Sequence, residues 1–139
     1  MIKNNITYKL GKEINIWKDG LAQTLTFIVT EDCNLRCSYC YITHKSSNKK
    51  MSFDVAKKFI DYVLSEEIVR PKGVILDFIG GEPLLEIKLI DQICDYFKLK
   101  TYLLNDEWYW DYRINVTTNG INYASKDVQD FIKKNQGKL

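Results

Sequence analysis

Segments typical of β-strands alternate three times with segments typical of helices after residue 24 of this 139-residue chain. The apolar, β-branched runs that predict strands are 25–30, 74–79 and 114–117. Apolar residues at helical spacing follow each run, within 55–63, 87–97 and 128–132. Strand–helix alternation of this kind predicts an α/β fold with a parallel sheet. We expect the first strand to be covered on both faces.

Local signals refine these segments. Ser52 and Ser125 stand where N-caps are expected, and Pro83 fits the first turn of the middle helix. Alternating apolar and polar residues across 6–17, around Gly11-Lys12, predict a short N-terminal β-hairpin. The aromatic-rich stretch 102–112 carries no clear periodicity and receives no assignment.

Composition narrows the classes of protein. No apolar run approaches the roughly 18 residues of a membrane-spanning helix, so no membrane partner is expected. The first residues, Met-Ile-Lys-Asn-Asn-Ile, lack the pattern of a secretory signal, which predicts a cytoplasmic protein. A net charge of +2 gives no reason to expect a nucleic-acid partner.

Three of the four cysteines lie within eight residues, as Cys33, Cys37 and Cys40. A disulfide framework would spread its cysteines along the chain and pair them, so this cluster favours a metal or an iron–sulfur centre. The spacing C-x3-C-x2-C can ligate three irons of a [4Fe-4S] cluster. The fourth iron then has an open position that can chelate a small molecule. Cys94 lies instead on an apolar helical face and is expected to be a buried structural thiol.

Two further segments follow the second and third strands. Gly80 and Gly81 allow the backbone to approach a ligand closely, and Glu82 offers a carboxylate at the rim to an ammonium group. Tyr39, between two cysteines, can lie against a planar base. Each feature alone, including the turn at Asn119, is an ordinary loop. The carboxyl ends of parallel strands meet at one edge, where ligands bind, so the cysteine cluster strengthens the functional interpretation of its neighbours.

The three segments, in this order and spacing, resemble the radical S-adenosylmethionine (radical SAM) enzymes over roughly residues 24 to 135. The sequence Cys-Asn-Leu-Arg-Cys-Ser-Tyr-Cys-Tyr, with Asp77-Phe78-Ile79 before the glycines, resembles the sequences of the branch that modifies peptides and proteins. That branch includes sulfatase-maturing enzymes and maturases of ribosomally made peptides.

The resemblance implies that Cys33, Cys37 and Cys40 ligate a [4Fe-4S] cluster. Its open iron would chelate the amino and carboxylate groups of S-adenosylmethionine. An electron from the reduced cluster would cleave the sulfonium to methionine and a 5′-deoxyadenosyl radical, which abstracts a substrate hydrogen. The cofactor carries this chemistry, and no catalytic residue is assigned within the chain.

The resemblance also places residues around the nucleoside. Glu82 would bind the methionyl ammonium, with backbone contacts from Gly80 and Gly81. Tyr39 would contact the adenine, and Asn119 would help to shape the cofactor site. The implied partners are a peptide or protein substrate and an external electron donor of the flavodoxin or ferredoxin type.

The family core is a partial TIM-like barrel of six βα units, each of roughly 30 or more residues. Residues 24–139 are therefore expected to be the first three units, the N-terminal half of a radical SAM domain in a larger enzyme. Residues 1–23 are expected to form the hairpin extension before it.

Three alternatives stay open. Cys33, Cys37, Cys40 and His44 can be ligands of a structural Cys3His zinc module. The chain can be a half-barrel without catalysis that binds a partner through its open edge and the aromatics of 108–112. Within the radical enzymes, the molybdenum-cofactor synthases share the glycine and asparagine motifs, so a small-molecule substrate is the third alternative.

Overall fold

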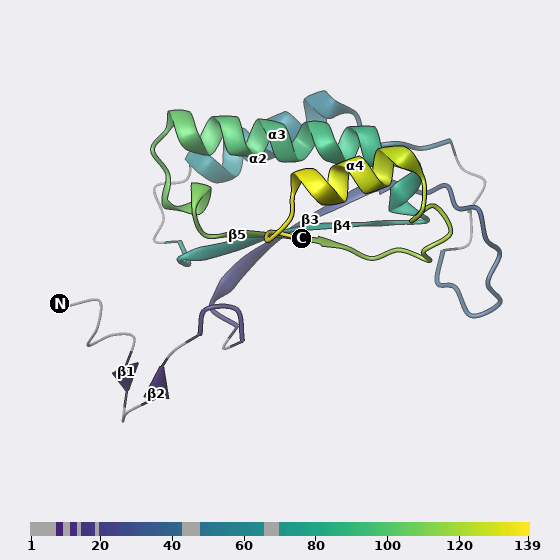
Figure 1. Cartoon of the computed structure of the whole chain (residues 1–139). Coiled ribbons are helices and arrows are strands. Elements are labelled where there is room, and N and C mark those ends of the chain that lie inside the picture. Colours follow the sequence, from purple (N-terminus) through teal and green to yellow (C-terminus); the bar gives the residue numbers. More distant parts are fainter. Residues whose placement is uncertain (1–7, 10–11, 14, 19, 43–47, 66–69) are drawn as a thin grey trace.

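The computed structural model describes residues 8–9, 12–13, 15–18, 20–42, 48–65 and 70–139 (Figure 1). Two short 3-10 helices, η1 and η2, accompany the α-helices and strands. The elements in chain order are β1 (Tyr8–Lys9), β2 (Lys12–Glu13), β3 (Ala22–Thr30), α2 (Phe53–Ser65), β4 (Gly73–Gly80), η1 (Pro83–Glu86), α3 (Ile87–Leu103), η2 (Glu107–Tyr109), β5 (Tyr112–Val116) and α4 (Lys126–Lys134). None of the helices in these ranges has the length and apolar character needed to cross a membrane.

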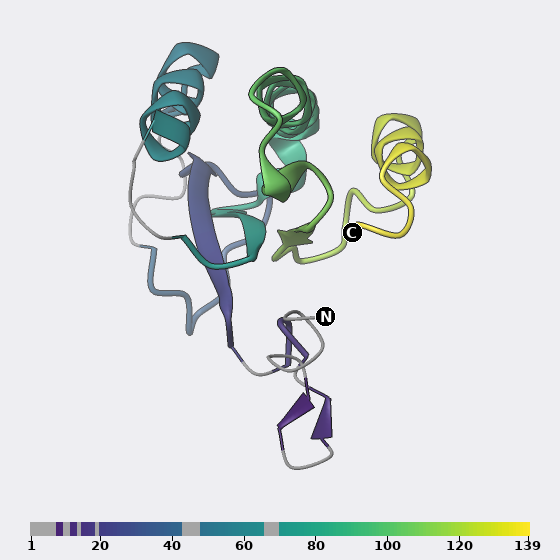
Figure 2. The same ribbon diagram turned by 90° about the vertical axis from the view of Figure 1, so that its left-hand side faces the viewer.

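The central sheet consists of three parallel strands in the order β3-β4-β5. Leu25 pairs with Leu76, and Leu76 pairs in turn with Ile114. Helices α2, α3 and α4 all lie over the same face of this sheet (Figures 1 and 2). The predicted α/β fold with a parallel sheet is therefore confirmed, and its helices lie on one face, as they do in the outer layer of a partial TIM-like barrel.

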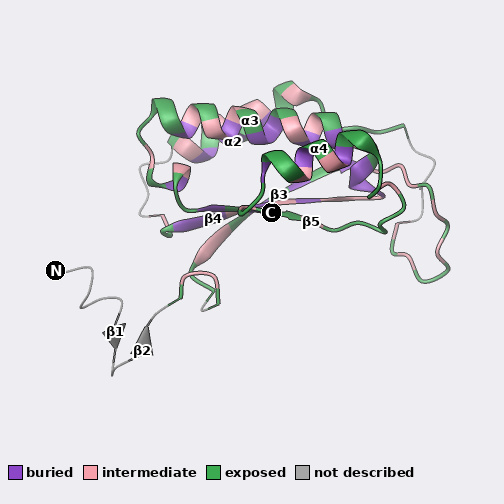
Figure 3. Ribbon diagram, viewed as in Figure 1, coloured by how far each residue is buried: buried purple, intermediate pink, exposed green. Residues whose placement is uncertain are grey.

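The core lies between the sheet and its helices (Figure 3). Phe27 of β3 stacks on Phe78 of β4 with ring centroids 5.3 Å apart, and both side chains are fully buried. On the opposite face of β3, Thr26 is exposed and Ile28 is 56% exposed. The expectation that this strand is covered on both faces is wrong for the described structure, because every helix packs against one side of the sheet.

Helix α2 begins as predicted. The Ser52 hydroxyl accepts a hydrogen bond from the Val55 backbone N–H at 3.2 Å, as an N-cap does. Ala56 and Ile60 are buried against the core, but Val55 is 54% exposed. The predicted apolar face of this helix is thus too wide, because only the side toward the sheet and α3 is covered.

Helix α3 buries the predicted face in full, including Cys94, which is 1% exposed. It continues to Leu103, beyond the predicted stretch.

After α3, the Trp108 side chain of η2 is buried and donates from Nε1 to the Pro71 carbonyl at 2.9 Å. The aromatic-rich segment without a sequence assignment therefore closes the amino-terminal end of the sheet.

The predicted N-terminal hairpin is confirmed as a pair of short antiparallel strands, β1 and β2. Its predicted turn at Gly11 lies outside the described residues. At the other end of the chain, the backbone of Lys138 accepts a hydrogen bond from Ile114 N–H at 2.7 Å. The last residues therefore bond to the outer edge of β5, an edge that a parallel sheet otherwise leaves unpaired.

Candidate functional site

Three loops extend from the carboxyl ends of β3, β4 and β5, at the same end of the sheet (Figure 1). We call residues 31–42 the cysteine loop, residues 80–83 the glycine loop and residues 117–122 the asparagine loop. A parallel sheet brings such loops together because all its strands end at one edge. The predicted position of all three motifs is confirmed by this arrangement.

The glycine loop lies directly against the backbone of the cysteine loop. Gly81 N–H donates to the Thr30 carbonyl at 2.9 Å, and Glu82 N–H donates to the Asp32 carbonyl at 2.8 Å. A Cβ atom at Gly81 would lie 2.1 Å from the Asp32 carbonyl oxygen, and Gly80 has a φ of +155°. The two glycines are therefore required for this close approach of two backbones. Their contact with a ligand stays a prediction.

Glu82 lies beneath the loops and not at the rim where the sequence analysis put it, since its side chain is 0% exposed. Its Oε1 accepts from Leu84 N–H at 3.0 Å and from the Thr118 hydroxyl at 2.6 Å, and its Oε2 accepts from Asn119 N–H at 2.8 Å. These bonds satisfy a buried carboxylate. The side chain thereby links the glycine loop to the asparagine loop, and its predicted contact with an ammonium group stays a prediction.

Asn119 links the asparagine loop to the cysteine loop. Its Nδ2 donates to Asn34 Oδ1 at 2.8 Å and lies 3.9 Å from Cys33 Sγ. Its Oδ1 accepts from Ile121 N–H at 3.1 Å. The structure therefore brings Asn119, Glu82 and Cys33, predicted from three separate motifs, into one hydrogen-bonded network.

The motif cysteines are partly exposed on their loop, as expected for side chains available to a ligand. Cys33 Sγ accepts a hydrogen bond from Leu35 N–H at 3.4 Å, and Cys40 N–H donates to the Cys37 carbonyl at 3.3 Å. Within the described ranges, no three His, Cys, Asp or Glu side chains gather as a site for a single ion. A [4Fe-4S] cluster binds each thiolate through a different iron. Three accessible thiols spaced along one loop are therefore compatible with such a cluster. His44, the fourth ligand of the zinc alternative, lies outside the described residues.

Tyr39 stands apart from this network, with 90% of its side chain exposed. Its contact with adenine stays a prediction. The buried thiol of Cys94 is separate as well. Burial raises the pKa of this thiol from 9.0 to about 12, which leaves it protonated and unreactive at neutral pH.

The structure adds residues that the sequence analysis missed. Asp32 caps the start of the cysteine loop by accepting Cys33 N–H at 2.9 Å, and Asn34 receives the amide of Asn119. On the uncovered face of the sheet, Asp77 accepts from Thr26 at 3.3 Å and from Asn115 at 2.6 Å. Asp77 is the one charged residue in the apolar run 74–79, and this was a signal in the sequence for a polar group on the sheet. Its partners, Thr26 and Asn115, lie on neighbouring strands.

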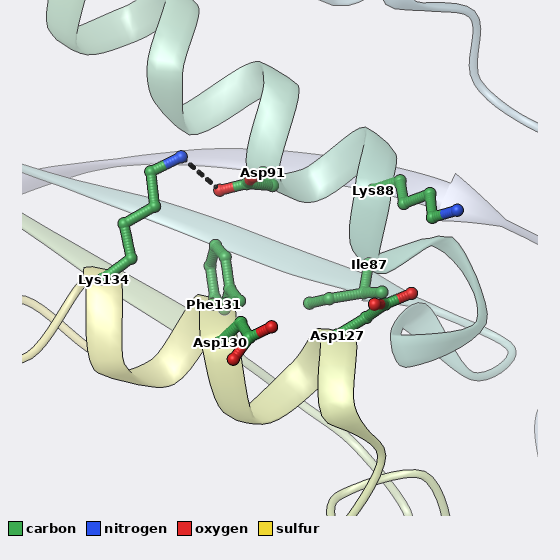
Figure 4. Close-up of a pocket in the computed structure, with 7 residues that line it drawn as sticks. All are labelled: Ile87, Lys88, Asp91, Asp127, Asp130, Phe131 and Lys134. Atoms are coloured by element: carbon green, nitrogen blue, oxygen red, sulfur yellow. Dashed lines mark hydrogen bonds and ion pairs between the residues drawn. The ribbon is translucent and has the colours of Figure 1, made fainter.

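A cavity of about 200 Å³ lies between α3 and α4, and no residue of the three loops lines it (Figure 4). Its lining residues are Ile87, Lys88, Asp91, Asp127, Asp130, Phe131 and Lys134. Lys134 Nζ pairs with Asp91 at 2.9 Å and with Asp95 at 2.7 Å. None of the predicted site residues lines this cavity. Asp91 and Lys134 of its lining pair with each other, and Asp130 pairs with Lys126 outside the lining.

Comparison with known proteins decides the family. The model of the family described as "4Fe-4S single cluster domain" matches residues 19–133, a range that contains all three loops. Radical SAM cyclopropyl synthase TigE of Paramaledivibacter caminithermalis is 26% identical over 126 residues, 81% of this chain and 25% of that protein. The chain belongs to this 4Fe-4S family within the radical SAM superfamily.

Two further relatives match shorter parts of the chain. An S-adenosylmethionine-dependent nucleotide dehydratase of Pseudoalteromonas ulvae is 32% identical over 82 residues, 50% of this chain and 27% of that protein. The uncharacterized protein MJ0907 of Methanocaldococcus jannaschii is 45% identical over 78 residues, 56% of this chain and 25% of that protein. The radical SAM chain described here thus spans about a quarter of the length of these relatives.

The solved structure of anSMEcpe with bound AdoMet and Cp18Cys peptide shares the fold of this radical SAM chain. The TM-score is 0.61 at 23% sequence identity, and the likeness covers 82% of this chain and 29% of that one. A second anSMEcpe structure with bound AdoMet gives a TM-score of 0.62. The three-stranded sheet and its helices therefore correspond to part of a larger fold.

Proposed function

We propose that this radical SAM chain holds a [4Fe-4S] cluster on Cys33, Cys37 and Cys40 and binds S-adenosylmethionine beside it. The observation that carries the proposal is the hydrogen-bonded meeting of the cysteine, glycine and asparagine loops at one edge of the sheet. Membership of a 4Fe-4S family supports the cluster, and solved neighbours with bound AdoMet support the nucleoside.

When bound, the cluster would supply the electron for reductive cleavage of S-adenosylmethionine, which would provide the chemistry for hydrogen abstraction from a substrate. The chain's own share is positioning. The glycine loop places its backbone against the cysteine loop, and the buried Glu82 carboxylate joins the glycine loop to the asparagine loop. Asn119 shapes the side of the site nearest Cys33, and the exposed ring of Tyr39 is free to lie on the adenine.

For the substrate, we propose a peptide or protein, modified after its synthesis. The amino-acid sequence of the cysteine loop and the peptide bound in the anSMEcpe structure support this choice. Residues 24–139 would supply the first three βα units of the barrel, and residues 1–23 the extension before them. An external flavodoxin or ferredoxin would deliver the electron. The dehydratase relative favours a second candidate, a nucleotide substrate, and the same loops would serve it.

The first experiment is anaerobic reconstitution of the chain with iron and sulfide. A brown protein with about four irons per chain and the spectrum of a cubane is expected from three cysteine ligands. Addition of S-adenosylmethionine is expected to change the Mössbauer signal of one iron only. A colourless protein with one bound zinc would support the Cys3His alternative and overturn the proposal.

The second experiment separates an active enzyme from a half-barrel that only binds a partner. The loaded chain is incubated with dithionite and S-adenosylmethionine, and 5′-deoxyadenosine is measured by chromatography. Formation of the nucleoside supports reductive cleavage. A fully loaded cluster that yields no 5′-deoxyadenosine would support the non-catalytic alternative. Peptides and nucleotides are then added to an active sample. The compound that acquires or loses hydrogen identifies the substrate class.

A further inference from the structure

Cys33 differs from an isolated loop thiol because two nitrogen donors face its sulfur. Leu35 N–H lies 3.4 Å from Sγ, and Asn119 Nδ2 lies 3.9 Å from it. The first donor comes from the cysteine loop itself. The second comes from 86 residues further along the chain, at the end of β5. The contact with Asn119 therefore depends on how the strands are placed beside one another.

The Asn119 side chain is held in this orientation from several directions. Its Nδ2 also donates to Asn34 Oδ1 at 2.8 Å, and its Oδ1 accepts from Ile121 N–H at 3.1 Å. Its backbone N–H is bound by the buried carboxylate of Glu82 at 2.8 Å. An amide with both ends engaged and a fixed backbone loses little freedom when it donates a further hydrogen bond.

We propose that Asn119 is a positioning residue that donates an N–H···S hydrogen bond to Cys33 and raises the reduction potential of the cluster. This inference rests on the proposed function, since it takes Cys33 as a cluster ligand. Reduction adds negative charge to the cluster and its sulfurs, so an N–H dipole directed at a ligand sulfur stabilises the reduced form more than the oxidised form. An easier reduction is what a centre needs if it must accept an electron before cleaving a sulfonium.

The test compares Asn119→Ala with Asn122→Ala. Asn122 lies on the same loop, and its Oδ1 accepts from Asn34 Nδ2 at 3.4 Å, so its loss perturbs the loop while Asn119 keeps its amide beside the sulfur. Each variant is reconstituted anaerobically, and its midpoint potential is measured by redox titration followed by EPR. A general disturbance of the loop would alter the solvent exposure of the cluster and shift the potential of both variants, whereas loss of the N–H···S bond shifts that of Asn119→Ala alone.

Removal of one charge-assisted hydrogen bond is expected to lower the ratio of reduced to oxidised cluster about tenfold at a fixed potential, which is about 59 mV for one electron. The Asn119→Ala potential should move to more negative values by this amount, and the Asn122→Ala potential should stay near that of the unmodified chain. Equal potentials in the two variants would overturn the inference.

If Asn119→Ala does not load, Asn34→Ala decides the matter. This variant removes the acceptor that orients the Asn119 amide and leaves the amide itself in place, so a smaller negative shift is expected. An unchanged potential in Asn34→Ala, with Asn119→Ala unloaded, would overturn the inference. Failure of the unmodified chain to take up any cluster would instead overturn the proposed function, so the two failures are distinguishable.

Discussion

The cysteine loop and the core beneath α3 use the same side chain in opposite ways. Cys33, Cys37 and Cys40 are partly exposed on a loop that also carries polar residues such as Asn34 and Arg36. Cys94 is 1% exposed between apolar side chains of α3, and burial raises the pKa of its thiol to about 12. The contrast shows that residue type alone does not make a ligand. Accessibility and nearby N–H donors separate a ligating thiol from a small hydrophobic one.

The two regions also differ in what holds them together. The core depends on apolar packing, such as the stack of Phe27 on Phe78. The loop edge depends on hydrogen bonds to Glu82 and Asn119, which join segments far apart in the chain. Substitutions in the core should therefore affect the stability of the chain first, whereas substitutions at the loop edge should affect what it binds.

The sharpest test of this contrast exchanges cysteines. Cys40→Ala should abolish cluster binding after anaerobic reconstitution, because two thiolates do not hold the cubane. Cys94→Ala should retain the iron content of the unmodified chain. Iron and acid-labile sulfide analysis measures both. Loss of iron in Cys94→Ala, with its circular dichroism unchanged, would contradict the assignment of Cys94 as a structural residue.

The next effect concerns the two faces of the sheet. Phe78→Ala should lower the free energy of unfolding of the cluster-free chain by about 3–5 kcal/mol, because it removes a fully buried ring from the core. Ile28→Ala, on the uncovered face, should change it by less than about 0.5 kcal/mol. Urea unfolding followed by circular dichroism measures both. A large cost at Ile28 would show that this face is covered, for example by a second copy of the chain.

A smaller effect is expected at the carboxylate that joins two loops. Glu82→Gln should destabilise the cluster-free chain by about 1–3 kcal/mol, because an amide nitrogen would replace an acceptor and leave a buried donor without a partner. Glu86→Gln serves as the control, since Glu86 pairs with the exposed Lys50 and should change stability little. Thermal unfolding without cofactor measures both. If Glu82 acted only by binding a ligand, the two variants would unfold alike.

The smallest effect is a pH dependence carried by Cys94. Burial raises the pKa of the native thiol from 9.0 to about 12, so the unfolded chain releases this proton first as pH rises. The contribution to stability is complete below pH 9 and is lost progressively toward pH 12. Between pH 8 and pH 10, the unmodified chain should lose about 1 kcal/mol relative to Cys94→Ala. Parallel urea titrations measure the difference, and curves that stay parallel would contradict the prediction.

The strands, helices and their order could be predicted from the sequence because they depend on local patterns. The spacing of Ile87, Ile90 and Phe97 identified the buried face of α3, and Ser52 identified the start of α2. The prediction for α2 was less accurate, since Val55 belongs to the apolar pattern but faces solvent. A periodic pattern says which residues share a side of a helix, and neighbouring elements decide how much of that side is covered.

The candidate site, too, could be predicted from the sequence only in part. The sequence by itself determined the thiol spacing, the glycine pair and the positions of three motifs after three strands, since each is a matter of a few adjacent residues. Only the tertiary structure decided that Glu82 is buried beneath the loops and that Asn119 reaches Cys33 across 86 residues. Local preferences act over a turn or a strand, whereas these contacts arise from strand order and register, which place distant loops side by side.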